Sequence, residues 1–346
     1  MNPITWTIFI STLSTSTIII MSCNHWLLAW LGLELNTLSI LPIIMKPHHP
    51  RATEATTKYF LIQTMAAALI LFASTTNAWQ TGNWIITPTA STMSNTLILS
   101  ALLLKMGIAP AHLWYPDIIQ GSSMLTAMII STWQKLAPLT LLYLTINTTS
   151  TQALLLTGAL SVLVGGWGGL NQTQTRKILA FSSIAHMGWL LVTLAFNPHL
   201  TTITMSIYLL MTTTIFTTLA TPATKTLKDL GFAWTHSPTL VATTTITLLS
   251  LGGLPPLTGF MPKLLILKEL TTTGLFLFAT ALAMMSLPSL YFYTRMTYLT
   301  SLTIPPNTLN TKYKWRLKPN QKLYPTLISP LATMILPITP LIYTYT

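Results

Sequence analysis

The segment Leu97-Ile-Leu-Ser-Ala-Leu-Leu-Leu-Lys-Met-Gly-Ile-Ala-Pro110 places a lysine and two helix-breaking residues inside a long apolar run. A second apolar run is interrupted by Gly252-Gly-Leu-Pro-Pro256, and Lys263 follows that interruption. A broken helix at membrane depth is tolerated only where protein or a water-filled cavity surrounds the freed backbone groups. The two segments therefore predict a polytopic membrane protein whose broken helices border a polar interior.

The composition agrees with this class. Of the 346 residues, 51% are apolar and only 6% are charged, whereas a soluble domain carries about 25% charged residues. The net charge of +12 does not indicate nucleic-acid binding, because the basic residues stand between apolar runs and not on a soluble basic face. The single cysteine, Cys23, excludes a disulfide framework and a multi-thiolate metal site.

Eleven apolar segments have the length of membrane-spanning helices, which need about 20 residues. The predicted fold is therefore all-α with about 11 transmembrane helices. The segments that contain the two interruptions are longer than a bilayer requires. The predicted spans lie near residues 3–23, 25–45, 57–77, 95–119, 123–146, 150–171, 175–196, 199–220, 238–267, 273–298 and 323–344.

The connecting loops predict the orientation of the chain. If the spans alternate from an inside N-terminus, thirteen Lys and Arg residues fall in inside loops and only Lys268 falls outside. Positive charge is retained on the side of synthesis, so we expect the N-terminus inside and the C-terminus outside. The inside residues are Lys46, Arg51, Lys58, Arg176, Lys177, Lys225, Lys228, Arg295, Lys312, Lys314, Arg316, Lys318 and Lys322.

The spans also form a weak internal repeat. Residues 1–148 and 149–298 each contain five spans, and the fourth span of each block is the broken, lysine-bearing one. Because five is odd, successive blocks insert with opposite topology, which is the pattern of inverted-repeat transporters with an ion path near the midplane. Residues 299–322 are predicted as a basic interfacial loop, and residues 323–346 as a C-terminal helix outside the repeat.

Four charged residues are expected to be buried within predicted spans: Glu34, Lys105, Lys135 and Lys263. Such residues are costly in a bilayer and usually mark an ion or proton pathway. Glu34 could instead be a protonated residue that makes one interhelical hydrogen bond, and Lys105 could extend its amine to the headgroups. Three lysines for one glutamate do not make static ion pairs, so the count favours sites that hold protons in turn.

Two histidines, His112 and His186, are titratable neighbours that could relay protons near neutral pH or could be ordinary core residues. They do not make a metal site, since no other ligand type stands at ligand spacing. The glycine-rich stretch Gly165–Gly169 lacks the strand and the lysine of a nucleotide-binding loop, and we expect it to permit close helix packing. The chain shows no flavin, nucleotide or iron–sulfur motif, so any redox chemistry belongs to another chain.

Three motifs, Leu104–Asp117, Gly166–Gly188 and Leu251–Lys263, resemble those of the antiporter-like subunits of respiratory complex I. In that family two inverted five-helix repeats each hold a half-channel, and a line of lysines joins them. By motif, the resemblance implies that Glu34 and Lys105 form a coupled pair. It also implies that Lys135 is the central lysine and Lys263 the terminal one.

The resemblance implies a proton-translocating subunit of NADH:ubiquinone oxidoreductase in the mitochondrial inner membrane, with the matrix as the inside. The expected partners are other membrane-arm subunits, including further antiporter-like ones, and an anionic lipid such as cardiolipin at the basic loop, but no nucleic acid. NADH, FMN, iron–sulfur clusters and ubiquinone would bind to other subunits, and none to this chain. Two alternatives are a stand-alone cation/proton antiporter and a structural helix bundle.

Overall fold

The computed structural model describes residues 3–87, 91–235, 237–303, 324–334 and 336–338. Within these ranges the regular elements are helices, and no β-strand occurs. Seven of the described helices are long and apolar enough to cross a membrane, and Thr92–Met106 and Pro238–Gly252 are shorter apolar helices. The predicted all-α polytopic membrane class is confirmed, whereas the number of eleven spans stays a prediction.

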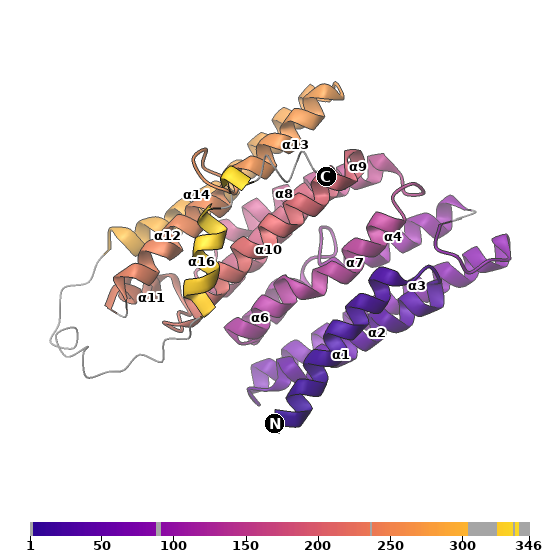
Figure 1. Cartoon of the computed structure of the whole chain (residues 1–346), viewed down its shortest axis with the longest axis horizontal. Helices are drawn as coiled ribbons and strands as arrows, with labels where there is room; N and C mark the ends of the chain where they lie inside the picture. Colours follow the sequence, from indigo (N-terminus) through magenta and orange to yellow (C-terminus); the bar gives the residue numbers. More distant parts are fainter. Residues whose placement is uncertain (1–2, 88–90, 236, 304–323, 335, 339–346) are drawn as a thin grey trace. The chain divides into compact units, whose positions relative to one another are not determined.

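The chain forms two compact units, Met1–Leu160 and Ser161–Thr346. In the first unit, α1 packs on α2, α2 on α3, and α3 on α4 (Figure 1). The helix α3 also packs on α5. The helices of this unit that precede α8 are α1 (Pro3–Ser22), α2 (Trp26–Met45), α3 (Pro50–Thr81), α4 (Thr92–Met106), α5 (Trp114–Gly121), α6 (Met124–Ser131) and α7 (Trp133–Leu144).

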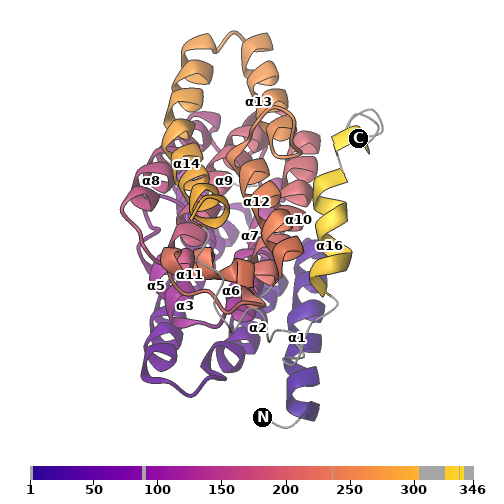
Figure 2. The ribbon, with the colours of Figure 1, turned by 90° about the vertical axis from the view of Figure 1, so that its left-hand side faces the viewer.

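The second unit is built around α9 and α10, whose apolar segments are 83% and 72% buried, against 22% for α1 in the other unit. The helix α16 packs on α10 and α12, and α13 and α14 pair as a hairpin (Figure 2). The elements are α8 (Thr151–Leu170), which crosses the division, α9 (Thr175–Phe196), α10 (Pro198–Ala220), α11 (Leu227–Phe232), η1 (Ala233–Thr235), α12 (Pro238–Gly252), α13 (Phe260–Thr272), α14 (Phe276–Ser301), α16 (Tyr324–Met334) and η3 (Leu336–Ile338).

The first predicted interruption is confirmed. The segment 95–119 consists of α4 and α5, separated at Gly107, whose φ of 69° is left-handed. The N–H of Gly107 donates to the carbonyls of Leu103 and Leu104, and the N–H of Ile108 donates to Leu103 at 3.1 Å. These bonds satisfy free carbonyls at the helix end, in the manner of a Schellman motif.

The second interruption is also confirmed and has the same local geometry. The helix α12 ends at Gly252, and Gly253 has a φ of 84° and donates its N–H to Leu249 and Ser250. A Cβ on Gly253 would lie 2.8 Å from the Lys263 Nζ. Glycine is therefore required here for its conformation and for the approach of Lys263.

Two other features occur at matching places in the two units. When Gly107 is aligned with Gly253, Pro110 falls opposite Pro256 and Pro116 opposite Pro262. An isolated bridge joins His25, before α2, to Ile85, beyond α3. A second bridge joins Gln174, before α9, to Thr226, beyond α10. The helix break and the isolated bridge thus occur at corresponding positions in the order of helices of the two units.

The structure corrects the prediction of one uninterrupted span over residues 123–146. The helix α6 ends at Ser131, and α7 begins at Trp133 after Thr132, whose φ and ψ are −109° and −71°. The Thr132 hydroxyl donates to the Met128 carbonyl at 2.6 Å, and such back-bonding bends helices. The break was missed because it contains neither glycine nor proline.

Two further features of the second unit are the close packing of α8 on α9 and a short, capped helix, α11. A Cβ on Gly165 would lie 2.6 Å from the Ala185 backbone nitrogen, so close packing of the glycine-rich stretch is confirmed at this residue. The unpredicted helix α11 begins with a capping box in which the N–H groups of Thr226 and Lys225 donate to the Asp229 carboxylate at 2.8 and 3.0 Å. These bonds lower the pKa of Asp229.

Part of the C-terminal region predicted from sequence cannot be compared with the structure. The basic residues of the loop, Lys312, Lys314, Arg316, Lys318 and Lys322, lie outside the described residues. Of the predicted helix 323–346, the described part contains α16 and the short η3.

Replacement of Gly253 by alanine should destabilise the second unit. A left-handed conformation costs a non-glycine residue about 1–2 kcal/mol, and the new methyl group would displace the Lys263 amine. We expect a lower temperature of thermal unfolding in detergent, followed by circular dichroism. The matched control is Gly252→Ala, since a Cβ there lies 3.7 Å from its nearest neighbour, a Tyr293 carbon. Equal stability of the two variants would contradict this account of the break.

Candidate functional site

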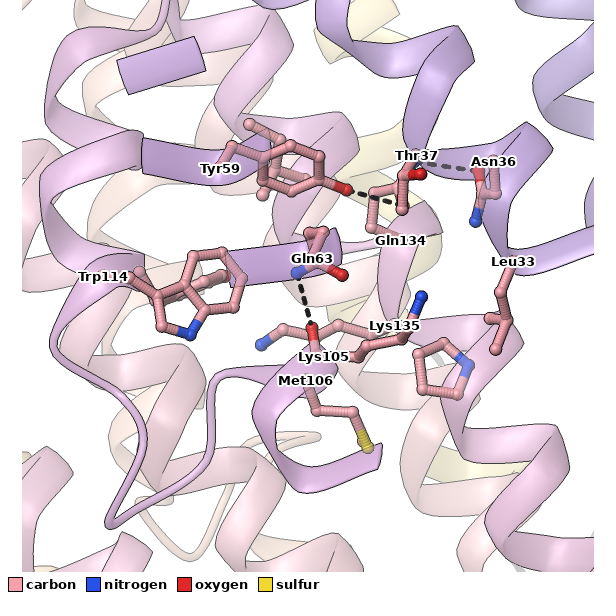
Figure 3. Close-up of a pocket in the computed structure, with 13 residues that line it drawn as sticks. Leu33, Asn36, Thr37, Tyr59, Gln63, Lys105, Met106, Trp114, Gln134 and Lys135 are labelled. Carbon is pink, nitrogen blue, oxygen red and sulfur yellow. Dashed lines mark hydrogen bonds between the residues drawn. The ribbon is translucent and has the colours of Figure 1, made fainter. Parts of the chain in front are cut away.

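Each unit contains a small buried cavity lined by predicted site residues. The cavity in the first unit has a volume of about 10 Å³ and is lined by Lys105 and Lys135 (Figure 3). The cavity in the second unit has a volume of about 30 Å³ and is lined by His186 and Lys263. A water molecule needs a cavity of about 10–15 Å³, so the first cavity is at the limit for one water and the second has room for more.

Lys105 lies in the last turn of α4, two residues before the break. It is 6% exposed, and its Nζ has no hydrogen-bond partner among the described residues. Its backbone carbonyl is one of those left free at the helix end and accepts from Gln63 Nε2 at 3.4 Å (Figure 3). The position of the break therefore fixes Lys105 at the cavity without giving its amine an acceptor.

Lys135 reaches the same cavity from the first turn of α7. It is 2% exposed, and its Nζ lies 4.8 Å from the centroid of the Tyr115 ring. A cation over an aromatic face is attracted by the ring quadrupole. The structure thus brings two predicted lysines to one cavity, each beside a helix interruption.

Glu34 lies near this pair but is not joined to it by an ion pair. The residue is half-buried on α2, and its carboxylate accepts from the Thr37 hydroxyl at 3.3 Å. Its helix neighbours Leu33, Asn36 and Thr37 line the cavity that also holds Lys105 and Lys135. Ion pairs are seen instead at the surface, where Lys58 pairs with Glu54 at 2.7 Å and with Asp117 at 3.3 Å.

Sequence reasoning missed a chain of uncharged polar residues around the cavity. Gln134 Nε2 donates to Asn36 Oδ1 at 3.0 Å, and the Tyr59 hydroxyl donates to Gln134 Oε1 at 3.3 Å (Figure 3). These contacts connect α2, α7 and α3. Their closeness in sequence to charged residues could have indicated them, because Asn36 follows Glu34 by two residues and Gln134 precedes Lys135.

Lys263 lies in the first turn of α13, beyond the second break. Its Nζ donates to the Gly252 carbonyl at 3.0 Å. This carbonyl belongs to the end of α12, where the helix dipole favours a positive charge. The side chain is half-buried and lines the cavity of the second unit.

The two histidines have different surroundings. His186 lines the second cavity; its Nε2 lies 3.4 Å from the Tyr293 hydroxyl, and its ring lies 5.7 Å from that of Tyr208. His112 lies in the segment between α4 and α5, where its Nδ1 is 3.2 Å from the Pro110 carbonyl oxygen. The cavity linings include His186 but not His112.

Metal ligands do not gather in the described part of the chain, where no group of three His, Cys, Asp or Glu side chains could hold an ion. The arrangement instead consists of amines, one carboxylate, an imidazole and hydroxyl groups around small cavities. Such groups can take up, hold and release protons.

Two family models match the sequence. The model described as "NADH:quinone oxidoreductase/Mrp antiporter, TM" matches residues 23–287, and the model described as "NADH dehydrogenase subunit 2 C-terminus" matches residues 290–343. Together they match most of the chain, from residue 23 to residue 343.

Several full-length relatives bear the name NADH-ubiquinone oxidoreductase chain 2. The chain is 52% identical to that of Carassius auratus over 100% of both chains. It is 53% identical to that of Salmo salar and 50% identical to that of Gallus gallus, over 99% of both chains in each case.

Solved structures have the same fold. A chain of respiratory complex I from Thermus thermophilus, determined with bound Aureothin, has a TM-score of 0.81 and 25% identity, with 97% of this chain and 80% of that chain covered. A chain of the Mrp complex from Dietzia sp. has a TM-score of 0.78 and 17% identity, with 87% and 61% covered. The chain therefore belongs to the NADH-ubiquinone oxidoreductase chain 2 family, within the wider family of NADH:quinone oxidoreductase and Mrp antiporter membrane subunits.

Proposed function

We propose that the chain is a proton-translocating, antiporter-like core subunit in the membrane arm of complex I, the H⁺-translocating NADH:ubiquinone reductase. Relatives that are at least 50% identical over nearly their whole length bear the name of this enzyme's chain 2. Since these relatives are vertebrate, the chain lies in the mitochondrial inner membrane. NADH, FMN, iron–sulfur clusters and ubiquinone bind to other subunits, and this chain holds no cofactor of its own.

The observation that carries the proposal is the convergence of Lys105 and Lys135 on one buried cavity. Each lysine lies beside a helix interruption, and the Lys105 amine has no hydrogen-bond acceptor among the described residues. An ammonium buried without an acceptor is strongly disfavoured against the neutral amine, whereas a nearby carboxylate favours the charged form. We therefore assign control of the Lys105 charge state to Glu34, whose helix neighbours Leu33, Asn36 and Thr37 line the same cavity.

Proton transfer in the first unit follows from these opposing influences. When the Glu34 carboxylate is close, Lys105 holds a proton; when the carboxylate is neutralised or withdraws, the buried amine releases it. Lys135 is the acceptor within the cavity, because the Tyr115 ring stabilises its positive charge. The chain of Asn36, Gln134 and Tyr59 keeps the surrounding helices in register and carries no charge itself.

The second unit offers Lys263 as a further proton site. Its amine is held at the broken end of α12 by the Gly252 carbonyl, and it shares a cavity with His186. We assign His186 as a relay group. His112 is a weaker candidate, because the cavity linings of both units lack it.

We further propose that residues 1–148 and 149–298 are inverted five-helix repeats. The matching left-handed glycines and isolated bridges support this assignment. The excess of Lys and Arg in alternate loops supports a matrix-side N-terminus and a C-terminus in the intermembrane space. Because the broken helix is repeated in opposite orientation, each unit has its own opening to the cavity that it contains.

Apolar outer helices fit a subunit of a larger membrane assembly. The apolar window of α1 is 22% buried and that of α14 is 28% buried, which leaves surface for lipid or for other membrane-arm subunits, further antiporter-like subunits among them. The basic sequence Lys312-Tyr-Lys-Trp-Arg-Leu-Lys318 suits an anionic lipid such as cardiolipin, since each basic residue near an anionic leaflet contributes about 1 kcal/mol.

A stand-alone cation/proton antiporter is the alternative, because the fold is shared with a chain of the Mrp complex as well as with a chain of complex I and does not separate the two. Mass spectrometry of the native particle separates the two. A large assembly with flavin and iron–sulfur subunits supports membership of complex I, whereas a particle that contains only copies of this chain contradicts it.

Replacement of Lys105 by methionine should lower proton pumping and coupled turnover by about tenfold or more, since loss of a positioned proton-transfer group typically costs 10²–10⁴-fold. NADH oxidation by an artificial acceptor should be unchanged, because the redox groups lie in other chains. Pumping is measured in proteoliposomes, and Lys225→Met, at an exposed loop position, is the control. Wild-type pumping by the Lys105 variant would contradict the assignment.

The variant Glu34→Gln should also pump poorly, because the amide keeps the shape and can still accept from Thr37 but cannot release a proton. The control is Glu54→Gln, which removes an exposed carboxylate from the Lys58 pair. If the Glu34 variant is assembled and pumps protons as well as the control does, Glu34 is only a structural contact.

A further inference from the structure

Tyr293 connects His186, which lines the second cavity, to a series of hydrogen-bonded side chains that was not predicted from the sequence. It lies on α14 and is 1% exposed, and its hydroxyl is 3.4 Å from Nε2 of His186 on α9. The same hydroxyl also hydrogen-bonds with Ser182. Ser182 and His186 lie one helical turn apart on α9, so the phenol bridges two side chains on the same face of that helix.

The surroundings hold this arrangement in place. The Tyr208 ring lies 5.7 Å from the imidazole of His186. The Phe292 ring lies 4.5 Å from that of Tyr293, at 47°. The ring also packs near the end of α12, where a Cβ on Gly252 would lie at an ordinary contact distance of 3.7 Å from the Tyr293 Cβ. The hydroxyl is therefore positioned by packing on its ring, independently of its hydrogen bonds.

The series of hydrogen-bonded side chains leads away from Lys263 toward one end of the second unit. Ser182 is seven residues from the start of α9, or about 10 Å along the helix axis, and its hydroxyl donates to the Leu179 carbonyl at 2.7 Å. Two residues beyond Tyr293, Arg295 donates to the Leu170 carbonyl at the end of α8 at 3.0 Å. The basic residues Arg176, Lys177 and Arg295 mark this end.

We propose that Tyr293 is a proton-relay residue that connects His186, and through the shared cavity Lys263, to the basic end of the second unit. The inference deepens the proposed function and rests on it. Neither the phenol nor Ser182 needs a charged resting state, because a chain of hydroxyl groups can pass a proton by exchanging donors and acceptors.

The transfer step balances with one water molecule as the final proton acceptor. In one direction, the N–H bond at Nε2 of protonated His186 breaks, an O–H bond forms on the Tyr293 oxygen, and the original phenolic proton moves to the Ser182 oxygen. The Ser182 O–H bond then breaks, and its proton forms an O–H bond on a water molecule at the side of the basic end, which carries it away as hydronium; rotation of the hydroxyl groups restores the starting arrangement. One positive charge moves, and no group is oxidised or reduced.

The test compares Tyr293→Phe with Tyr291→Phe in the assembled complex in proteoliposomes. The first variant keeps the buried ring and removes the bridging hydroxyl; the second removes a hydroxyl from a tyrosine that is 58% exposed on the same helix. We expect Tyr293→Phe to slow coupled turnover about tenfold or more and to increase its H₂O/D₂O rate ratio, because proton transfer becomes rate-limiting. Tyr291→Phe should match the wild type.

A merely structural role would not change the isotope ratio, so wild-type turnover or an unchanged ratio in Tyr293→Phe overturns the proposal. If Tyr293→Phe does not assemble, Ser182→Ala is the second variant. It removes the hydroxyl at the other end of the hydrogen-bonded series without changing the tyrosine ring, and it should also raise the H₂O/D₂O rate ratio. If it leaves turnover and the ratio at wild-type values, the relay is excluded. The variant Lys263→Met separates the two proposals. If Lys263→Met loses pumping while Tyr293→Phe behaves as the wild type, only the relay is refuted. If Lys263→Met pumps normally, the proposed function of the second unit is refuted.

Discussion

The need to satisfy backbone groups where helices are interrupted determines the rest of the structure. Lipid offers no hydrogen bonds to the carbonyls freed at Gly107 and Gly253, so protein must supply the partners. The left-handed glycines satisfy some of them through their own and the following N–H groups. Gln63 satisfies the carbonyl of Lys105, and the Lys263 amine satisfies that of Gly252. Polar side chains therefore collect at both breaks, and the cavities lie there.

The same constraint explains why the lysines can serve as proton sites. A lysine inside an unbroken helix would meet either lipid or a packed core, and both oppose its charge. At the interruptions, the amines meet carbonyl oxygens, an aromatic face and small cavities. In the proposed function, small movements of Glu34 or of water change the balance between the charged and neutral forms of Lys105 and Lys135, which are 6% and 2% exposed. Local bistability of this kind is what a proton-translocating subunit requires.

Sequence reasoning predicted the class of fold and both glycine–proline breaks, because apolar length and helix-breaking residues act locally. It failed at Thr132, where a side-chain hydroxyl bonded to the Met128 carbonyl accompanies the break. It identified the charged residues of the site, since charge inside an apolar segment is conspicuous. It missed the neutral partners, such as Gln134 and Tyr293, because their roles arise from contacts across helices. Neutral polar residues occur throughout this threonine-rich chain, so their type alone carried no signal.

The most direct test of the central claim is the number of protons pumped per NADH oxidised by a Lys135→Arg complex in proteoliposomes. Arginine keeps the positive charge and the contact with the Tyr115 ring, but it stays protonated at any relevant pH. If Lys135 passes protons through the shared cavity, the variant assembles and oxidises NADH with an artificial acceptor, while its coupled proton pumping is lost. A wild-type ratio of protons to NADH, at a wild-type rate, would reduce Lys135 to a fixed charge and contradict the account.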